Sequence, residues 1–522
     1  MNSFSAKITL FVFPLLFLCF SGNAQVLSGS QIDSLVQKTM KTFDVPGMAV
    51  AVLKDGKIYH KNTFGVRSLK TNAPVDENTL FGVASNTKAF TTAALGQLID
   101  QGNLTWDTKV TDIIPEFKLH DAYVTSEFTV RDLVTHRSGL GLGAGDLMIF
   151  PAANTTTKAE LIHNLRYLKP VSSFRSKFDY DNLLYIVAGE IVARISGKDF
   201  DNYISANFFK PLGMSRSLLS IPEIKADANR IDGHAPVNGN LEVTGDTFTQ
   251  LATPAGGIYA SINDMSVWAQ AQLNRGRYGA KLQDSLFSKD VHAEMWTPQT
   301  ILRSGKGPYN THFSAYGLGW FLSDVNGYFQ ATHTGGLLGI VSQVTLIPEL
   351  DLGIIVLTNQ QSGAAFTAIT NSIKDGYFNI KGEDRIKQYN DRRLAGERKA
   401  DSIVLAVEKN IAAQLKTKAQ KPNPLDYIGV YEDAWFGKVT ISNQNGKLRF
   451  ISEKSADLKG TMTFYKGTTY VVYWDDPALK ADAFVNFSLD EEAKAAGFLI
   501  SAISPLTDFS YDFQDLDFQK VE

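Results

Sequence analysis

The sequence predicts a protein of the α/β (α+β) class that is followed by a small all-β unit. Strand-like segments lie on both sides of a long helical block, and short strands recur at close spacing from Leu425 onward. Strands that helices separate along the chain can still meet in one sheet, because the helices cover its faces. We therefore expect a mixed sheet in which N-terminal and C-terminal strands are neighbours.

Length and composition limit the function classes. A chain of 522 residues is too long for one ordinary core, so two or three folded units are expected. A hydrophobic content of 44% and a charged content of 20% are typical of a globular protein. The formal net charge of −3 indicates no bulk attraction to nucleic acid or to an anionic membrane.

Residues 1–24 have the pattern of an export signal peptide. Lys7 is the only charged side chain there, an apolar stretch follows it, and Gly22-Asn23-Ala24 places small residues before a cut after Ala24. The apolar run is short for a membrane span, so we expect no stable span and a periplasmic or extracellular protein; a retained anchor is the alternative. The single cysteine, Cys19, lies in this segment, and Leu18 before it disfavours a lipid anchor. The mature chain would then hold no disulfide framework, thiol nucleophile or cysteine metal site.

The N-terminal elements follow in order. Residues 31–42 have helical spacing, and residues 47–66 read as a hairpin whose two strands join at Asp55-Gly56, a type I′ turn signal. Residues 84–100 form a helix whose small residues allow close packing. Together with the following sequence to residue 380, these elements belong to the first folded unit, which begins at residue 25.

The rest of the chain divides into three parts. Residues 105–240 are mainly helices and loops, and strands return from residue 316. Residues 381–422 have helical propensity and form a connector that ends at prolines. Residues 423–522 contain short strands, with an Asn445-Gly446 turn, and predict a small barrel or sandwich.

Ser85 and Lys88, in "FGVASNTKAF", are the first candidate catalytic residues. A serine and a lysine three positions apart on a helix share a face, so the amine can take the hydroxyl proton. The helix N-terminus favours the alkoxide that would form, and burial helps the lysine to lose its proton. Because Ser-x-x-Lys alone is a weak signal, an ordinary solvated lysine is the alternative.

Two other segments add weight to this pair. Tyr180 and Asn182 open a predicted helix in "FDYDNLLYIVAGEIV"; a phenol near a lysine ammonium has a lowered pKa and can act as a base, and the amide can orient a substrate. The plain alternative is a helix cap before a core helix. In "HTGGLLG", residues 333–336 lie on a predicted strand whose glycines let substrate approach the strand edge, and a backbone N–H there can bind an oxyanion. The alternative is a glycine-rich strand end.

The order and spacing of these three segments resemble the penicillin-recognising serine hydrolases, which include class C β-lactamases, DD-peptidases, D-aminopeptidases and esterases. The stretches "RDLVTHRSGL", "FFKPLGM", "TPAGGIYASINDMSVWAQ" and "YGLGWF" are also similar to that family, and the resemblance spans residues 30–375. It implies a β-lactamase-like fold, with a mixed antiparallel sheet flanked by helices beside an all-helical region. The active site would lie at their junction.

The resemblance also implies roles for individual residues. Ser85 would be the acylated nucleophile, Lys88 its proton-handling partner and Tyr180 the base or acid. The substrate would be bound by Asn182 and by the third active-site strand, which carries His333, Thr334, Gly335 and Gly336, and the oxyanion by the backbone N–H groups of Ser85 and Gly336. The implied activity is hydrolysis of amide or ester bonds in a small-molecule or peptide substrate, including D-amino-acid-containing or cell-wall peptides. No cofactor and no metal are expected.

Two positions depart from the family pattern. His333 stands where a Lys-Thr-Gly strand has lysine, and a histidine that titrates near pH 6–7 suits a substrate carboxylate less well than a fixed cation. This favours a peptidase or esterase over a true β-lactamase. Either His333 binds carboxylates when protonated, or it is a neutral hydrogen-bond partner of Ser85 or Tyr180. Asp181 replaces a small residue, and the sequence offers no account of it.

The β-rich tail, which begins with "YIGVYE", resembles the lipocalin-like domain that follows such hydrolases in some relatives. That resemblance implies a tail that covers the active site or joins subunits into a homo-oligomer. Zinc-hydrolase histidine spacing, the Gly-x-Ser-x-Gly elbow and a phosphate-binding loop are absent from the sequence. A non-catalytic penicillin-binding or sensor protein on the same fold is the alternative from another class.

Overall fold

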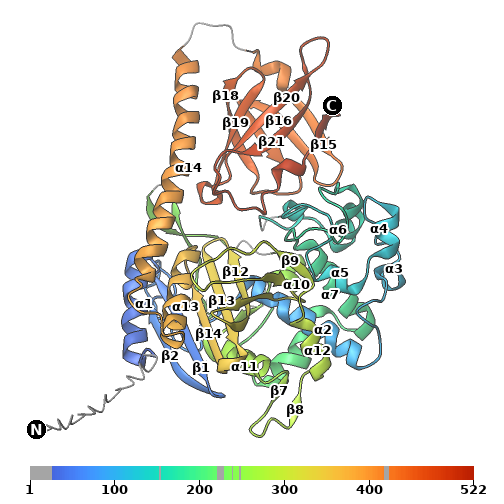
Figure 1. The fold of residues 1–522 in the computed structure, drawn as a ribbon. Helices are drawn as coiled ribbons and strands as arrows, with labels where there is room; N and C mark the ends of the chain where they lie inside the picture. The colour runs from blue at the N-terminus through green and yellow to red at the C-terminus, as the bar shows by residue number, and fades with distance from the viewer. Residues whose placement is uncertain are drawn as a thin grey trace, which may run out of the picture.

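The computed structural model describes residues 26–151, 154–219, 228–237, 239–245, 249–416 and 422–521. The predicted export segment, with Cys19, lies outside these residues. Figure 1 shows a helix-flanked sheet beside a helical region, and a barrel above them that a long helix connects to the sheet.

An eight-stranded sheet forms the centre of the first unit. Its strands pair antiparallel in the order β2-β1-β14-β13-β12-β11-β10-β9. Their bounds in that order are Lys57–Gly65, Gly47–Lys54, Leu352–Thr358, Ile340–Ile347, Tyr328–Leu337, Phe321–Val325, Ser314–Tyr316 and Thr300–Leu302. The N-terminal strand β1 pairs with the C-terminal strand β14, which confirms the expected meeting of the two ends.

Both faces of this sheet are covered. The predicted hairpin forms β1 and β2, and its turn residues Asp55 and Gly56 both have positive φ, as a type I′ turn requires. Residues 48, 50 and 52 of β1 pack under α1 (Gly29–Phe43) and α13 (Gly363–Tyr377), while 49, 51 and 53 face the opposite core. Figure 1 shows α1 and α13 on one side of the sheet.

The chain between the N-terminal and C-terminal strands of the sheet forms most of the helical region, which lies beside the sheet in Figure 1. Its helices are α2 (Thr87–Asp100), α3 (Val110–Ile113), α4 (Ala122–Glu127), α5 (Val130–Leu133), α6 (Lys158–Asn164), α7 (Leu183–Ser196), α8 (Phe200–Ile204), α9 (Lys210–Leu212), α10 (Thr253–Gly256), α11 (Ile262–Leu273) and α12 (Lys289–Met295). Three two-stranded sheets pair β3 (Phe81–Gly82) with β6 (Tyr259–Ala260), β4 (His234–Val237) with β5 (Asn240–Val243), and β7 (Arg277–Tyr278) with β8 (Asp284–Ser285). The predicted helix at 84–100 is α2, preceded by the 3-10 turn η1 (Ala84–Asn86).

The C-terminal unit is a closed eight-stranded antiparallel barrel, which confirms a barrel over a sandwich. Its strands are β15 (Gly429–Asp433), β16 (Gly437–Gln444), β17 (Lys447–Ser452), β18 (Lys459–Lys466), β19 (Thr469–Trp474), β20 (Ala483–Leu489), β21 (Ala495–Ala502) and β22 (Phe518–Lys520). The connector is the long helix α14 (Arg385–Lys416), which runs from beside α13 up along the barrel in Figure 1. The predicted Asn445-Gly446 turn joins β16 to β17.

The barrel also contacts the helical region directly. Lys454 forms an ion pair with Glu160 at 2.8 Å, and Asn164 donates a hydrogen bond to the Trp435 carbonyl at 2.9 Å. Buried apolar side chains of the two units form one continuous cluster. Independent folding of the barrel, and its lipocalin likeness, stay predictions. Within the described ranges, no helix combines the length and apolar character needed to cross a membrane.

Candidate active site

Ser85 lies in a tight turn between strand β3 and helix α2. Ala84, the residue before it, has a φ of 49°, a left-handed conformation that is uncommon for a residue with a side chain. The turn is held from the sheet, because Ser342 of β13 donates a hydrogen bond to the Val83 carbonyl at 2.7 Å and accepts one from the Asn86 amide at 2.8 Å. The sheet therefore fixes where the serine stands.

Lys88, the second residue of helix α2, is buried beside the serine. Its Nζ atom lies 3.1 Å from the Ser85 hydroxyl, 2.7 Å from Asn182 Oδ1 and 2.8 Å from the Ala255 carbonyl oxygen. The side chain is fully buried, and this desolvation lowers its pKa from 10.5 to about 7, although nearby Asp146 and Asp181 oppose the shift. The structure thus brings together the two residues that the spacing predicted.

Tyr180 lies beside both Ser85 and Lys88. The Lys88 Nζ atom is 4.8 Å from the centroid of the Tyr180 ring, and the Tyr180 hydroxyl is hydrogen-bonded to the Ser85 side chain. The expectation that lysine lowers the phenol pKa is wrong. Burial, which disfavours the phenolate, raises the pKa of Tyr180 well above its usual value. The phenol is therefore protonated at neutral pH and can donate a proton or a hydrogen bond.

Asn182 connects this group to a buried carboxyl. Its Oδ1 accepts from Lys88, while its Nδ2 donates to Asp146 Oδ2 at 2.8 Å. Asp146 is the first residue of the 3-10 turn η2 (Asp146–Met148) and is fully buried. Its desolvation is the largest of the effects on its pKa and raises that pKa to about 8. Nothing in the local sequence indicated this aspartate, because its partners lie far away in the chain.

Strand β12 provides an open edge beside the serine. Strand β11 pairs only with residues 328–332 of β12, so residues 333–337 have no partner from that side. A Cβ on Gly335 would overlap the Val83 carbonyl oxygen below the nucleophile turn, whereas one on Gly336 would meet nothing within 4 Å. Gly335 therefore permits the close approach of strand and turn, and Gly336 keeps the cavity side open.

His333 does not have the environment that the sequence suggested. It is 1% exposed, its Nδ1 donates to the Thr334 carbonyl at 2.6 Å, and its Nε2 accepts from the Tyr316 hydroxyl at 3.1 Å. Desolvation, followed by the charge of Lys88, lowers its pKa to about 3. The expectation of titration near pH 6–7 toward a substrate carboxylate is therefore wrong. The neutral interpretation fits, but the partner is Tyr316 rather than Ser85 or Tyr180.

Two further buried groups hold the tyrosine segment. His136, in the "RDLVTHRSGL" stretch, packs against Tyr180 with tilted rings whose centroids are 4.2 Å apart, and its Nδ1 accepts the backbone N–H of Asp181 at 3.1 Å. Asp181 itself accepts the backbone N–H of Leu184 at 3.2 Å and so caps helix α7. This capping accounts for the aspartate that the sequence left unexplained.

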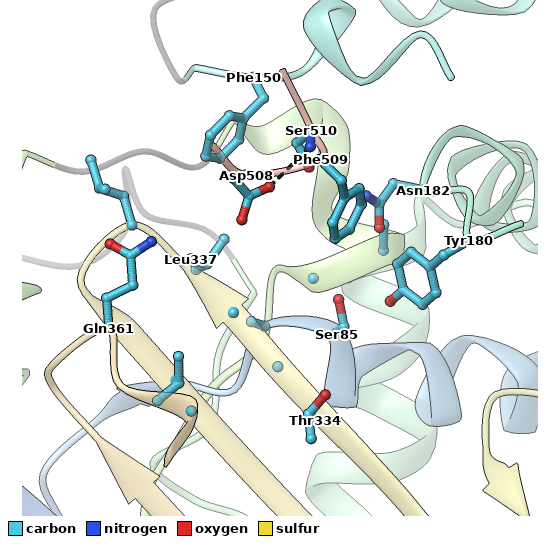
Figure 2. A pocket seen from close by; sticks show the side chains of 18 of the residues that line it. Ser85, Phe150, Tyr180, Asn182, Thr334, Leu337, Gln361, Asp508, Phe509 and Ser510 are labelled. Carbon is cyan, nitrogen blue, oxygen red and sulfur yellow. Dashed lines mark hydrogen bonds between the residues drawn. The ribbon is translucent and has the colours of Figure 1, made fainter. Parts of the chain in front are cut away.

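These groups open into a cavity of about 490 Å³. Ser85, Tyr180, Asn182 and residues 333–336 all line it, and most of its other described lining side chains are apolar. The barrel closes one wall through residues 506–511; Phe509 meets the Tyr180 ring edge to face, with centroids 5.8 Å apart. Figure 2 shows Phe509 and Ser510 approaching Asn182 and Tyr180 from the side opposite Thr334.

A helix-covered antiparallel sheet beside a helical region, with a serine at a helix start between them, defines the class as serine hydrolases of β-lactamase-like fold. The chain belongs to the Beta-lactamase family, whose model matches residues 32–375. Residues 415–520 match a second model, described only as a domain of unknown function (DUF3471).

Curated relatives and solved structures agree with this family. The chain is 26% identical to "Unguisins hydrolase ungD'" of Aspergillus campestris over 84% of this chain and 83% of that protein. It is also 26% identical to "Unguisins hydrolase ungD" of Aspergillus violaceofuscus over 67% of this chain, but it spans only 65% of the length of that relative. It is 25% identical to "Protein flp" of Staphylococcus aureus over 64% of this chain and 64% of that protein.

Two solved structures share the fold. The octameric penicillin-binding protein homologue from Pyrococcus abyssi aligns with a TM-score of 0.59 at 20% identity, over 95% of this chain and 100% of that one. A class C β-lactamase aligns with a TM-score of 0.54 at 22% identity, over 67% of this chain and 96% of that one. At these identities, the likeness establishes the fold.

Proposed function

We propose that this protein is an exported serine hydrolase that cleaves amide or ester bonds through an acyl-enzyme on Ser85. The observation that carries the proposal is the Lys88 amine, buried and 3.1 Å from the Ser85 hydroxyl. A serine hydroxyl is a weak nucleophile until an adjacent base takes its proton. A lysine with a pKa of about 7 is such a base at neutral pH.

The other partners of Lys88 can also be satisfied by a neutral amine. Asn182 Oδ1 and the Ala255 carbonyl oxygen can only accept hydrogen bonds, so they would take the two N–H groups of that amine. The ammonium form donates a third hydrogen bond to Ser85 Oγ, whereas the neutral amine would turn its lone pair toward Ser85 and accept the hydroxyl proton. When Ser85 Oγ bonds to the substrate carbonyl carbon, its proton passes to Lys88 Nζ.

The remaining groups complete the reaction. The protonated phenol of Tyr180 lies next to Ser85 and supplies the proton to the leaving amine or alcohol as the carbonyl carbon–heteroatom bond breaks. The backbone N–H groups of Ser85 and Gly336 are the proposed donors to the oxyanion. Water then attacks the ester on Ser85 and gives one proton to the Tyr180 phenolate. As the bond between Ser85 Oγ and the acyl carbon breaks and the acid product leaves, the Lys88 ammonium returns its proton to Ser85 Oγ.

The cavity favours neutral, apolar substrates of the peptidase or esterase type. His333 is neutral and faces Tyr316, so it gives no fixed cation for a carboxylate beside Thr334. The unpaired edge of β12 suits an extended peptide or amide backbone, including one that contains D-amino acids. Two relatives are named as hydrolases of unguisins, and neither is named as a β-lactamase; a true β-lactamase is the second candidate.

A non-catalytic penicillin-binding or sensor role is the candidate from another class. The intact Ser85–Lys88 contact argues against it, because a binding protein needs no buried base. Export remains part of the proposal and rests on residues 1–24. Its test is the mass of the mature N-terminus after expression in a bacterial host, which should begin at Gln25.

Intact-mass spectrometry tests acylation directly. The protein is incubated with a penicillin, a p-nitrophenyl ester and a D-amino-acid p-nitroanilide, and the adduct mass and turnover are measured for each. We expect an acyl adduct and turnover with the ester or amide, and slower turnover of the penicillin. Faster turnover of the penicillin than of both other probes would instead support a β-lactamase.

Two serine variants provide the matched comparison. Ser85→Ala should abolish adduct and turnover, while Ser126→Ala, which removes an exposed serine hydroxyl from α4, should leave both unchanged. An adduct that persists in Ser85→Ala would contradict the proposed mechanism. Stoichiometric adduct with no turnover for any probe would support the binding or sensor role.

A further inference from the structure

The barrel does more than cover the cavity, because it contacts the turn that carries Asp146. Asp512, which follows the wall segment, accepts the backbone N–H of Gly145 at 2.5 Å and that of Leu147 at 3.3 Å. Ser510 donates its hydroxyl to Asp146 Oδ2 at 2.9 Å. Both aspartates are fully buried, whereas Ser510 is half-buried and lines the cavity.

These contacts continue without a break to the nucleophile. Asp146 Oδ2 accepts from both Ser510 and Asn182, Asn182 Oδ1 accepts from Lys88, and Lys88 lies in contact with Ser85. Five side chains thus link a loop of the C-terminal barrel to the serine through four hydrogen bonds of 2.7–3.1 Å.

The helical region is shaped to receive this loop. Gly143 has a φ of 72°, and a Cβ on it would lie 2.6 Å from the Phe509 carbonyl oxygen. Phe150 packs against Tyr511 with ring centroids 5.6 Å apart. Any larger residue at position 143 would push the loop, and Ser510 with it, away from Asp146.

Asp146 depends on the barrel for one of its two side-chain hydrogen bonds. Its Oδ2 receives both, while its Oδ1 is buried without a hydrogen-bond partner among the described residues. Without Ser510, Asn182 would be the remaining side-chain donor to this carboxyl, which could then rotate. Because buried hydrogen-bond networks orient their members jointly, that rotation would reach Asn182 and Lys88.

We propose that Ser510 is a positioning residue for the hydrolase site: the barrel fixes Asp146, and thereby holds Asn182 and Lys88 in the geometry that activates Ser85. This inference rests on the proposed function, and it gives the C-terminal barrel a part in the chemical step. A purely structural role for Ser510 would predict lower stability without a selective loss of rate.

The test compares hydroxyl variants of the full-length protein in hydrolysis of p-nitrophenyl butyrate. Ser510→Ala should lower kcat about 5- to 50-fold and change KM less than twofold, within the 10²-fold that a misplacement of about 1 Å can cost. Ser510→Thr, which keeps a hydroxyl, should recover most of the rate. Ser510→Val should not, because valine has nearly the shape of threonine but lacks the hydroxyl. The matched control is Thr468→Ala, because the Thr468 hydroxyl donates to the Phe487 carbonyl within the barrel at 2.8 Å, away from the cavity.

Each result bears on the inference. A kcat for Ser510→Ala within twofold of wild type, an equal loss in Thr468→Ala, or a loss confined to KM would overturn it. If Ser510→Ala folds poorly, the Thr and Val variants decide: equal kcat values would overturn the inference, and a Thr variant at least fivefold faster would support it. Acylation that survives in Ser510→Ala but not in Ser85→Ala would leave the proposed function intact while removing Ser510 from it.

Discussion

The titration of Lys88 should control the rate of acylation. Burial lowers its pKa from 10.5 to about 7, so at pH 7 about half of the molecules hold a neutral amine, compared with about one in 3,000 for an unshifted lysine. The neutral fraction falls to about a tenth at pH 6 and about a hundredth at pH 5. Since only the neutral amine takes the Ser85 proton, the rate should rise with pH and level off near pH 8.

The assay is the burst of p-nitrophenol released from p-nitrophenyl butyrate, followed by stopped flow between pH 5 and 9. This ester carries no titrating group, so the profile reports the protein. Two neighbouring carboxyls face Lys88 and titrate in the same range, Asp146 with a pKa raised to about 8 and Asp181 with one raised to about 7, both by burial. His136 and His333 also face the site, but burial lowers both pKa values.

A charge variant separates Lys88 from these groups. The negative charge of Asp181 raises the Lys88 pKa, so Asp181→Asn should move the acid limb of the profile to lower pH while an amide oxygen can still cap α7. The control is Asp121→Asn, because Asp121 caps α4 in the same way by accepting the Val124 N–H at 3.0 Å. A flat profile between pH 5.5 and 8.5, or a limb that Asp181→Asn moves to higher pH, would refute the assignment of the base.

Three other predictions follow from single contacts. Tyr180→Phe should cut kcat by about 10²–10⁴-fold with little change in KM, and an unchanged kcat in steady-state assays would make the phenol a wall of the cavity. Gly335→Ala should lower the free energy of unfolding by about 1–3 kcal/mol because its Cβ overlaps the Val83 carbonyl, whereas Gly336→Ala should alter it by less than about 0.5 kcal/mol; equal urea midpoints would contradict this. Burial raises the Asp512 pKa, so its stabilising effect is present below its unfolded pKa and is lost as pH rises toward the folded value. Asp512→Asn should therefore flatten the fall in stability as the pH rises above the ordinary carboxyl range, and a pH dependence of the urea midpoint identical to that of wild type would count against it.

Local spacing was enough to predict that Ser85 and Lys88 would lie together, while their roles as nucleophile and base come from the family resemblance and stay a proposal. Ser85 lies in the 3-10 turn η1 and Lys88 at the start of α2, so the short separation brings the two side chains together. The order and spacing of the strand-like segments likewise predicted the hairpin, the meeting of the two chain ends in one sheet, and a C-terminal barrel or sandwich. Such short-range patterns depend on backbone geometry that every sequence shares.

The electrostatics of the site could not be read from the sequence. An ammonium attracts a phenolate, so the expectation that Lys88 lowers the pKa of Tyr180 has the correct sign for two charges in water. Desolvation by the surrounding side chains is the larger effect and raises that pKa. His333 was placed on the correct strand, yet its burial beneath Tyr316 depends on a residue of another strand. Ser510 and Asp146 are 364 positions apart, and no local signal connects residues at that separation.

Because residues 506–511 of the barrel form one wall of the cavity, the site can become complete only late in the synthesis of the chain. Ribosomes release the N-terminal part of a chain first, and domains fold largely as they emerge. The serine, the lysine and the glycine strand are all synthesised long before the loop that closes the cavity and donates to Asp146. A partly synthesised chain would thus display an open cleft with a loosely held base. Competence for hydrolysis would arrive only once the barrel has formed and docked, which delays activity until synthesis has passed residue 510.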